Sequence, residues 1–171
     1  MNSPLKNSSI LWVVEKLVEE STKLRGNPKP ERCGGYLTVL VRGEPQISLC
    51  SVVGYFGEGD DNPEQYLIYS QEKAERLRKW WHQHRSSWQS RDPDQGRYGG
   101  AISADQRIIS FSGLPELVDE AVVTAAAYWL GWLSYESVLT IMEASMNLFI
   151  PELIARIVNW PSVEEFEIFP S

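Results

Sequence analysis

The chain has 171 residues, of which 43% are apolar and 23% are charged, and this composition is typical of one globular domain. No apolar run reaches the length of about eighteen residues that spans a bilayer, and the N-terminus lacks the pattern of a secretory signal. The net charge of −7 disfavours binding to nucleic acid. We therefore expect a soluble, cytoplasmic protein whose residues 1–171 form a single domain, with a core over 8–160 and an acidic tail over 161–171.

The start of the chain predicts a helix followed by a hairpin. Ser8 or Ser9 can cap the helix, whose apolar residues recur at helical spacing. Strands are expected over 35–41 and 47–53, because both runs are rich in β-branched and apolar residues. The turn-forming residues 42–45 join them, so the two strands should pair as an antiparallel hairpin.

The next stretch predicts a loop and a long basic helix. Residues 57–63 (GEGDDNP) have the composition of a flexible loop, and 66–69 is compatible with a short edge strand. Ser70 can then cap a helix of about twenty residues over 71–89, which carries several tryptophans and the two histidines.

Residues 98–131 are the stretch around which the fold is organised. Short apolar runs at 101–104 and 107–111 flank a turn and predict a second hairpin. Ser112 and Gly113 end it, and Pro115 suits the first turn of a helix, where its missing N–H costs nothing. The helix that follows has an apolar stripe on one face and is expected to lie in the core.

Two further helical patterns follow, over 135–148 and from Pro151 to Trp160. The tail over 163–169 alternates apolar and acidic residues, so it is either an extra edge strand or a disordered acidic end. Together these elements predict an α+β fold, with an antiparallel or mixed sheet of about five strands and helices packed on it.

The residues that usually carry chemistry form no known motif. His82 and His84 are two residues apart on a predicted helix, so they point to nearly opposite sides and cannot hold one metal together. Cys33 and Cys50 are most simply small, half-buried apolar residues, although a disulfide between them is not excluded. We therefore predict no metal site and no catalytic residue.

The charges are unevenly distributed along the chain. Cations gather in the predicted helix 71–89, whereas from Pro115 onward Arg156 is the only basic residue among nine acids. Two such regions can attract each other within a chain or between copies. Together with the seven tryptophans, this predicts a homo-oligomer, most simply a dimer, and makes helix 71–89 a candidate surface for a protein partner.

The central stretch also resembles a known family, the haem-binding HbpS/GlcG-like proteins. The matching residues are Gly99, Gly100, Ala101, Ile102, Ser112, Gly113, Glu116, Asp119 and Glu120. The similarity covers about 35–131 and leaves the C-terminal helices outside it. It implies a profilin-like α/β domain that binds a small molecule, with haem as a candidate cofactor.

The resemblance and the residues together suggest a non-enzymatic module that binds or senses a small molecule. The predicted ligand-binding residues are Gly99, Gly100, Ser112 and Gly113, together with Trp80, Trp81 and His84 from the preceding helix. The alternative is a regulatory or scaffold module that binds other proteins and has no small ligand. An enzyme would need residues brought together from distant parts of the chain.

Overall fold

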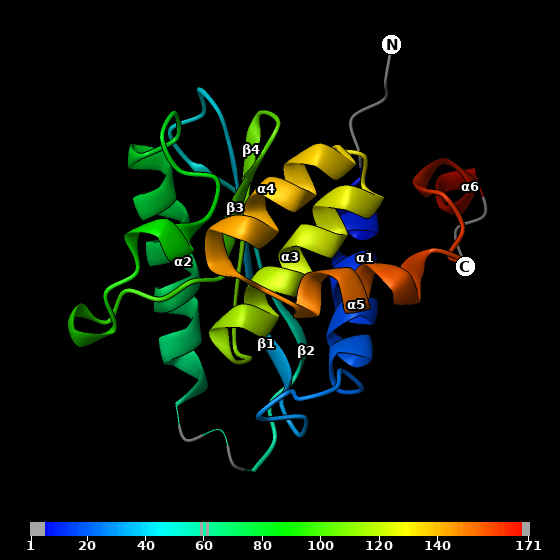
Figure 1. Cartoon of the computed structure of the whole chain (residues 1–171), viewed down its shortest axis with the longest axis horizontal. Coiled ribbons are helices and arrows are strands. Elements are labelled where there is room, and N and C mark those ends of the chain that lie inside the picture. Colours follow the sequence, from blue (N-terminus) through cyan, green and yellow to red (C-terminus); the bar gives the residue numbers. More distant parts are fainter. Residues whose placement is uncertain (1–5, 59, 61, 169–171) are drawn as a thin grey trace.

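The computed structural model describes residues 6–58, 60 and 62–168, and the fold is α+β as predicted. Helices surround one antiparallel sheet (Figure 1). The elements are α1 (Asn7–Ser21), β1 (Cys33–Val41), β2 (Ile47–Tyr55), α2 (Pro63–Lys79), the short 3₁₀ helices η1 (Ser87–Ser90) and η2 (Pro93–Gln95), β3 (Ala101–Ala104), β4 (Arg107–Ser112), α3 (Glu116–Trp129), α4 (Tyr135–Ser145), α5 (Phe149–Ile157) and α6 (Val163–Ile168).

The sheet has four strands in the order β2-β1-β4-β3, and all neighbours are antiparallel. It consists of the two predicted hairpins, which are joined where β1 pairs with β4 and Val39 lies opposite Ile109. The central strands β1 and β4 are buried on both faces, which explains why Arg107, at the start of β4, is their only charged residue.

Helices cover both faces of the sheet. Helices α1 and α3 lie on one face and α2 lies on the other, while α4 and α5 pack outside α3 (Figure 1). Side chains alternate between the faces along each strand, so Leu37 and Phe111 contribute to the large core with α1 and α3. Leu40 and Ile108 contribute to a small cluster beneath α2. The sheet therefore separates a large apolar core from a smaller one.

Helix α3 is the core helix that the sequence predicts. Every residue from Val118 to Ala127 is buried, because α3 is enclosed by the sheet, α1, α4 and α5. Three consecutive alanines allow this close packing. Pro115 lies directly before the helix, at its N-cap.

The predicted number of strands and two strand candidates have to be corrected. The sheet has four strands, not about five, and no parallel pair occurs among the described residues. Residues 66–69 are helical, because α2 begins at Pro63, a residue that favours the first helical turn. Residues 163–168 of the tail form helix α6, and Phe169 lies outside the described residues. Phe166 stacks on Trp12 with ring centroids 4.4 Å apart, so an aromatic contact with α1 holds this helix.

The prediction of a long basic helix over 71–89 is also wrong at the C-terminal end of that helix. Helix α2 stops at Lys79, and the chain then turns before Ser86 caps η1 with Gln89 in a reciprocal capping box. At the other end of the chain α1 begins at Asn7, so Ser8 and Ser9 lie inside its first turn and do not cap it. Both cysteines are free, and among the described residues no helix is long and apolar enough to cross a bilayer.

Candidate functional site

A buried ion pair joins the helices from opposite faces of the sheet. Lys73 of α2 donates from Nζ to Asp119 Oδ2 of α3 at 2.9 Å and to the carbonyl oxygen of Phe111 at 3.0 Å. Both charged side chains are only 2% exposed. The other carboxylate oxygen of Asp119 accepts the backbone N–H of Leu114 at 2.9 Å, which fixes the start of α3. The pair therefore lies where β4 ends and α3 begins.

Gly100 makes room for this ion pair. Its backbone has a φ of +115°, and a Cβ at this position would lie 2.8 Å from both Lys73 Nζ and Asp119 Cβ. Any larger residue would push the two charged groups aside or strain the backbone. This packing explains why the sequence has a glycine immediately before β3.

A cavity of about 300 Å³ lies over the ion pair, and we call it the Lys73 cavity. Its lining comes from the loop after α1, the first half of α2, Tyr98, the end of β4 and the start of α3. The lining residues are Pro28, Lys29, Arg32, Tyr66, Tyr69, Lys73, Tyr98, Ser112, Leu114, Pro115, Glu116 and Asp119.

Tyrosines form the walls of the Lys73 cavity. Tyr69 and Tyr98 meet edge to face, with ring centroids 5.2 Å apart. Tyr66 stacks on Phe56 at 6.0 Å, and the guanidinium of Arg32 lies 5.7 Å from the centre of the Tyr66 ring. Such rings offer flat apolar surface together with hydroxyl groups. The cavity therefore suits a ligand that has both a planar apolar part and polar groups.

The charges around the cavity are mixed, and most acids already have a cation. Asp119 pairs with Lys73, Glu116 pairs with Arg91 at 2.5 Å, and Arg32 lies 3.8 Å from Asp60. Burial raises the pKa of Asp119 to about 6, although the nearby Lys73 ammonium acts in the opposite direction. Lys29 is exposed and has no ion-pair partner among the described residues, so the cavity mouth has spare positive charge.

The structure places the four predicted small residues beside this cavity, but it gives them different roles. Ser112 lines it directly. The N–H of Gly99 donates to Glu116 Oε2 at 2.9 Å, so it is not free for a ligand. A Cβ on Gly113 would lie 2.2 Å from the carbonyl oxygen of Gly34, so this glycine allows the close approach of β1.

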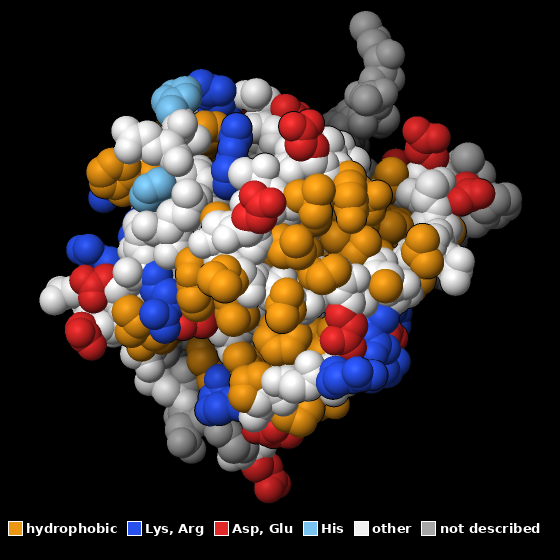
Figure 2. All heavy atoms as spheres, in the orientation of Figure 1, with side chains coloured by type: hydrophobic (Ala, Val, Ile, Leu, Met, Phe, Trp, Pro, Cys, Tyr) orange, Lys and Arg blue, Asp and Glu red, His pale blue; other side chains and the backbone are white. Residues whose placement is uncertain are grey.

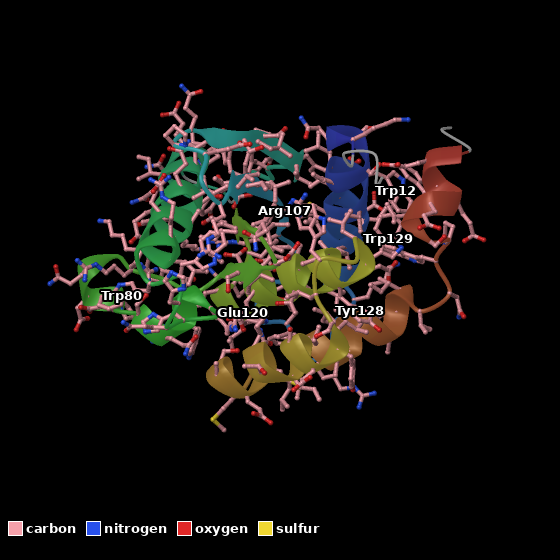
Figure 3. All side chains as sticks on the ribbon, turned by 90° about the horizontal axis from the view of Figure 1, so that it is seen from above. Trp12, Trp80, Arg107, Glu120, Tyr128 and Trp129 are labelled. Carbon is pink, nitrogen blue, oxygen red and sulfur yellow. The ribbon has the colours of Figure 1, made fainter. Side chains whose placement is uncertain are left out.

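The three predicted aromatic residues lie elsewhere. Trp80 and His84 stack with ring centroids 5.4 Å apart and line a separate cavity of about 370 Å³, the Trp80 cavity. Trp81 faces Arg42 instead, with the guanidinium 5.7 Å from its ring. Figure 3 places Trp80 far from Trp12 and Trp129, at the opposite end of the molecule.

The side chain of Arg76 separates the two cavities. It lines the Trp80 cavity and donates to the carbonyl oxygen of Tyr98, which lines the Lys73 cavity. It also donates to the backbone of Ser87 and Ser90, so it is held on several sides. The predicted site is therefore divided into two parts that do not share a lining residue.

This division does not fit a haem site. A haem slot needs an apolar, flat cavity beside an axial ligand. The candidate ligand His84 instead lies in a cavity lined by Glu72, Glu75, Lys79 and Arg97, all charged. The glycine residues that the resemblance assigns to the ligand lie beside the other cavity. Among the described residues, no group of three or more His, Cys, Asp or Glu is placed to hold a metal ion.

Sequence reasoning missed the residues that form the walls of the Lys73 cavity. Tyr66, Tyr69 and Lys73 have the spacing i, i+3, i+7 and share one face of α2. That signal was hidden because 66–69 was interpreted as a strand. The pairing of Lys73 with Asp119 joins residues 46 positions apart, and no local pattern indicates it.

A second buried carboxylate, that of Glu120, is structural. It accepts hydrogen bonds from Ser86, Ser145 and Asn147, which links α3 to η1 and to the end of α4 (Figure 3). Burial raises its pKa, and the three donors act against that rise. Since none of the cavities described above includes Glu120, its position indicates a role in packing.

In comparisons with known proteins, no family model matches the chain, and no curated protein and no solved structure is significantly similar to it. The HbpS/GlcG-like assignment therefore stays a prediction from the residues quoted above.

Proposed function

We propose that the chain is a non-enzymatic module that binds or senses a small organic acid with a planar, aromatic part, and that the Lys73 cavity is its binding site. The observation that carries the proposal is a fully buried ion pair beneath a cavity with tyrosine walls. We further propose a profilin-like fold and HbpS/GlcG-like ancestry, supported by the residues of the central stretch. The cytoplasmic location stays a prediction.

The ion pair supports a functional role because a buried ion pair contributes little net free energy to the stability of a fold. Desolvation of two charges offsets most of their attraction, and apolar residues of similar volume usually stabilise a protein as well or better. Lys73 and Asp119 instead keep a charged, hydrogen-bonded floor beneath the cavity. Such a floor can orient the polar groups of a ligand.

Three further features select the class of ligand. The volume of about 300 Å³ is at the lower end of the range for small-molecule pockets. Tyr69 and Tyr98 provide aromatic surfaces for a flat ring, and Lys29 and Arg32 supply positive charge at the mouth. A small aromatic carboxylate matches all three features.

The test uses a matched pair of probes, naphthoate and the neutral naphthalenemethanol, in ligand-observed NMR and calorimetry. We expect naphthoate to bind saturably and the alcohol to bind more weakly. Tyr69→Ala should weaken naphthoate binding about tenfold, because aromatic residues dominate such contacts. The control Tyr135→Ala changes an exposed tyrosine on α4 and should leave binding unchanged. If neither naphthoate nor the alcohol binds saturably, the proposal is rejected.

The rival function is a scaffold that binds other proteins without a small ligand. It is favoured by apolar side chains on the outer surface over α3, α4 and α5 (Figure 2). Among them Tyr135, Met146, Leu148 and Val158 are all more than half exposed. If neither probe binds, this function becomes the leading one.

Haem is tested separately by titrating haemin into the unmodified chain and into His84→Ala. From the charged lining of the Trp80 cavity we expect no Soret shift that depends on His84. A shift that disappears in the variant would restore haem as the cofactor and would contradict the ligand class proposed above.

A further inference from the structure

The two edges of the sheet differ in how they are covered. At the β3 edge, the segment before and within η1 occupies the outer side of the strand. The N–H of Ser103 donates to the carbonyl oxygen of Arg85 at 2.9 Å, and the N–H of Ala101 donates to Ser87 Oγ at 3.0 Å. Ser86 also forms an antiparallel bridge with Ile102. This edge is therefore closed to another strand.

The β2 edge is open along its length. Strand β2 is nine residues long, and none of the described segments pairs with its outer side. Its sequence, ISLCSVVGY, contains no charged residue and no proline. Natural edge strands usually carry such residues, or are short, because these features prevent pairing with another chain. Strand β2 has none of these features. Its register does shift at Ser48, because Val39 lies opposite Leu49 and Leu40 lies opposite Ile47, so the regular part of the open edge begins at Leu49.

The surface beside the β2 edge is apolar and partly uncovered. Helix α2 packs on β1, β3 and β4, and the β2 residues Ser48, Cys50 and Val52 are exposed. Val52 is 47% exposed and Tyr55 is 70% exposed. An edge strand with such side chains would bury them on pairing with a second strand.

We propose that β2 pairs antiparallel with β2 of a second copy of this chain around a two-fold axis. Such a contact is isologous, so residue i of one copy faces residue j of the other and the reverse also holds. A strand without charges is compatible with its own copy, because no like charges come to lie opposite each other. The paired sheets form one continuous sheet across the dimer. Gly54, with a φ of +73°, is where the regular pairing ends.

The intrachain ion pairs of α2 support this choice of surface. The sequence predicts helix 71–89 as a basic surface for partners, but its cations are largely paired within the chain. Lys73 bonds to Asp119, Arg76 to Glu72 and Arg78 to Glu75. The uncharged edge of β2 is therefore the better candidate for self-association.

The first measurement is the mass in solution, by sedimentation equilibrium at tens of micromolar. We expect twice the chain mass of 19.5 kDa. Val52→Lys puts a charge on the pairing strand of both copies, so the contact must bury like charges on one edge, and the dissociation constant of the dimer should rise about tenfold or more. The matched control Val158→Lys changes a residue on the C-terminal side of α5 that is 74% exposed, and it should leave the dimer intact.

The second measurement is amide hydrogen exchange of the unmodified chain, which does not depend on the folding of a variant. In a free edge strand every second N–H faces water, whereas in the dimer the N–H groups of 49–53 on both sides of β2 are bonded. We expect all of them to be protected at high concentration and alternate ones to exchange quickly on dilution. A monomer at tens of micromolar would overturn the proposal. A dimer in which the N–H groups of β2 still exchange alternately would also overturn it, because the copies would then associate through another surface and the β2 edge would be free to bind a peptide of another protein.

Discussion

The two faces of the sheet are built from different chemistry. On the α1 and α3 face, side chains such as Leu17 and Val122 pack in a dry core with no exposed surface. On the α2 face, the apolar cluster around Leu77 is small, and buried polar groups surround it. Charged groups such as Lys73 need specific partners, whereas the apolar side chains between the sheet, α1 and α3 need only volume. The buried carboxylate of Glu120 on α3 is the exception, and its donors come from the segments around η1 and α4. The first face therefore contributes most of the apolar core, and the second is the face beside which we propose the binding site.

The largest effect is expected when one member of the ion pair is removed. Asp119→Ala leaves Lys73 buried without a counter-charge, so we expect the free energy of unfolding to fall by about 3–5 kcal/mol. Urea denaturation measures this loss. The double variant Lys73→Met with Asp119→Leu should recover most of the stability but bind naphthoate more weakly. If the double variant binds as well as the unmodified chain, the pair has only a structural role.

The opposite face supplies the control for that experiment. Leu17 is fully buried in the dry core. Leu17→Ala should lower the free energy of unfolding by about 2–5 kcal/mol, because it leaves a cavity. In the fraction that remains folded, the affinity for naphthoate should be unchanged.

The second prediction concerns pH and follows from the raised pKa of Asp119. The folded chain releases this proton near pH 6, whereas the unfolded chain releases it near the ordinary value of 3.8. Between these values only the folded chain holds the proton. The contribution of Asp119 to the free energy of unfolding therefore falls as pH rises through this interval. Above pH 6 this contribution is constant. Relative to Asp119→Asn, which lacks this proton, the unmodified chain should lose roughly 1–3 kcal/mol over that interval. Equal pH profiles of the two proteins would contradict it.

The third and smallest effect is expected from a neutral hydrogen bond on the α2 face. Thr38 Oγ1 accepts from Ser70 Oγ at 2.9 Å, and both residues are fully buried. Thr38→Val keeps the shape but removes the acceptor, so thermal unfolding should show a loss of about 1 kcal/mol. Thr140→Val, at an exposed position on α4, should stay within about 0.5 kcal/mol of the unmodified chain. A larger loss at Thr140 than at Thr38 would show that the polar contacts beneath α2 contribute little.

Local patterns were sufficient for much of the fold. The hairpin over β3 and β4 and the core helix α3 were predicted because strand alternation and helical spacing are carried by neighbouring residues. The same reasoning failed at Tyr66, where a short apolar run is compatible with either a strand or a helix, and the signal from Pro63 was overlooked. In the tail, Phe166 is helical because it packs on Trp12, a contact that no local pattern contains.

The candidate site was predicted only in part for a related reason. Ser112 is predicted as a ligand-binding residue, whereas Asp119 is noted only among the residues that carry the family resemblance. The partner of Asp119 comes from α2, on the other face of the sheet. His84 and Trp80 were assigned to the same site because the helix was extended past Lys79. Once the helix stops there, these rings turn into a different cavity. The apolar and basic pattern continues past Lys79, so it does not reveal that α2 ends there and that Ser86 begins the separate helix η1.

The contact between the first and last helices has a consequence for how the domain can be connected to other chains. Ser9 on α1 donates to Glu167 on α6 at 2.9 Å, so the two ends of the fold lie together. A domain whose ends meet can be inserted into a loop of a host protein without stretching the host, and its ends can be linked and the chain reopened elsewhere. The Lys73 cavity is built from segments between the two ends and would be carried intact into such a fusion.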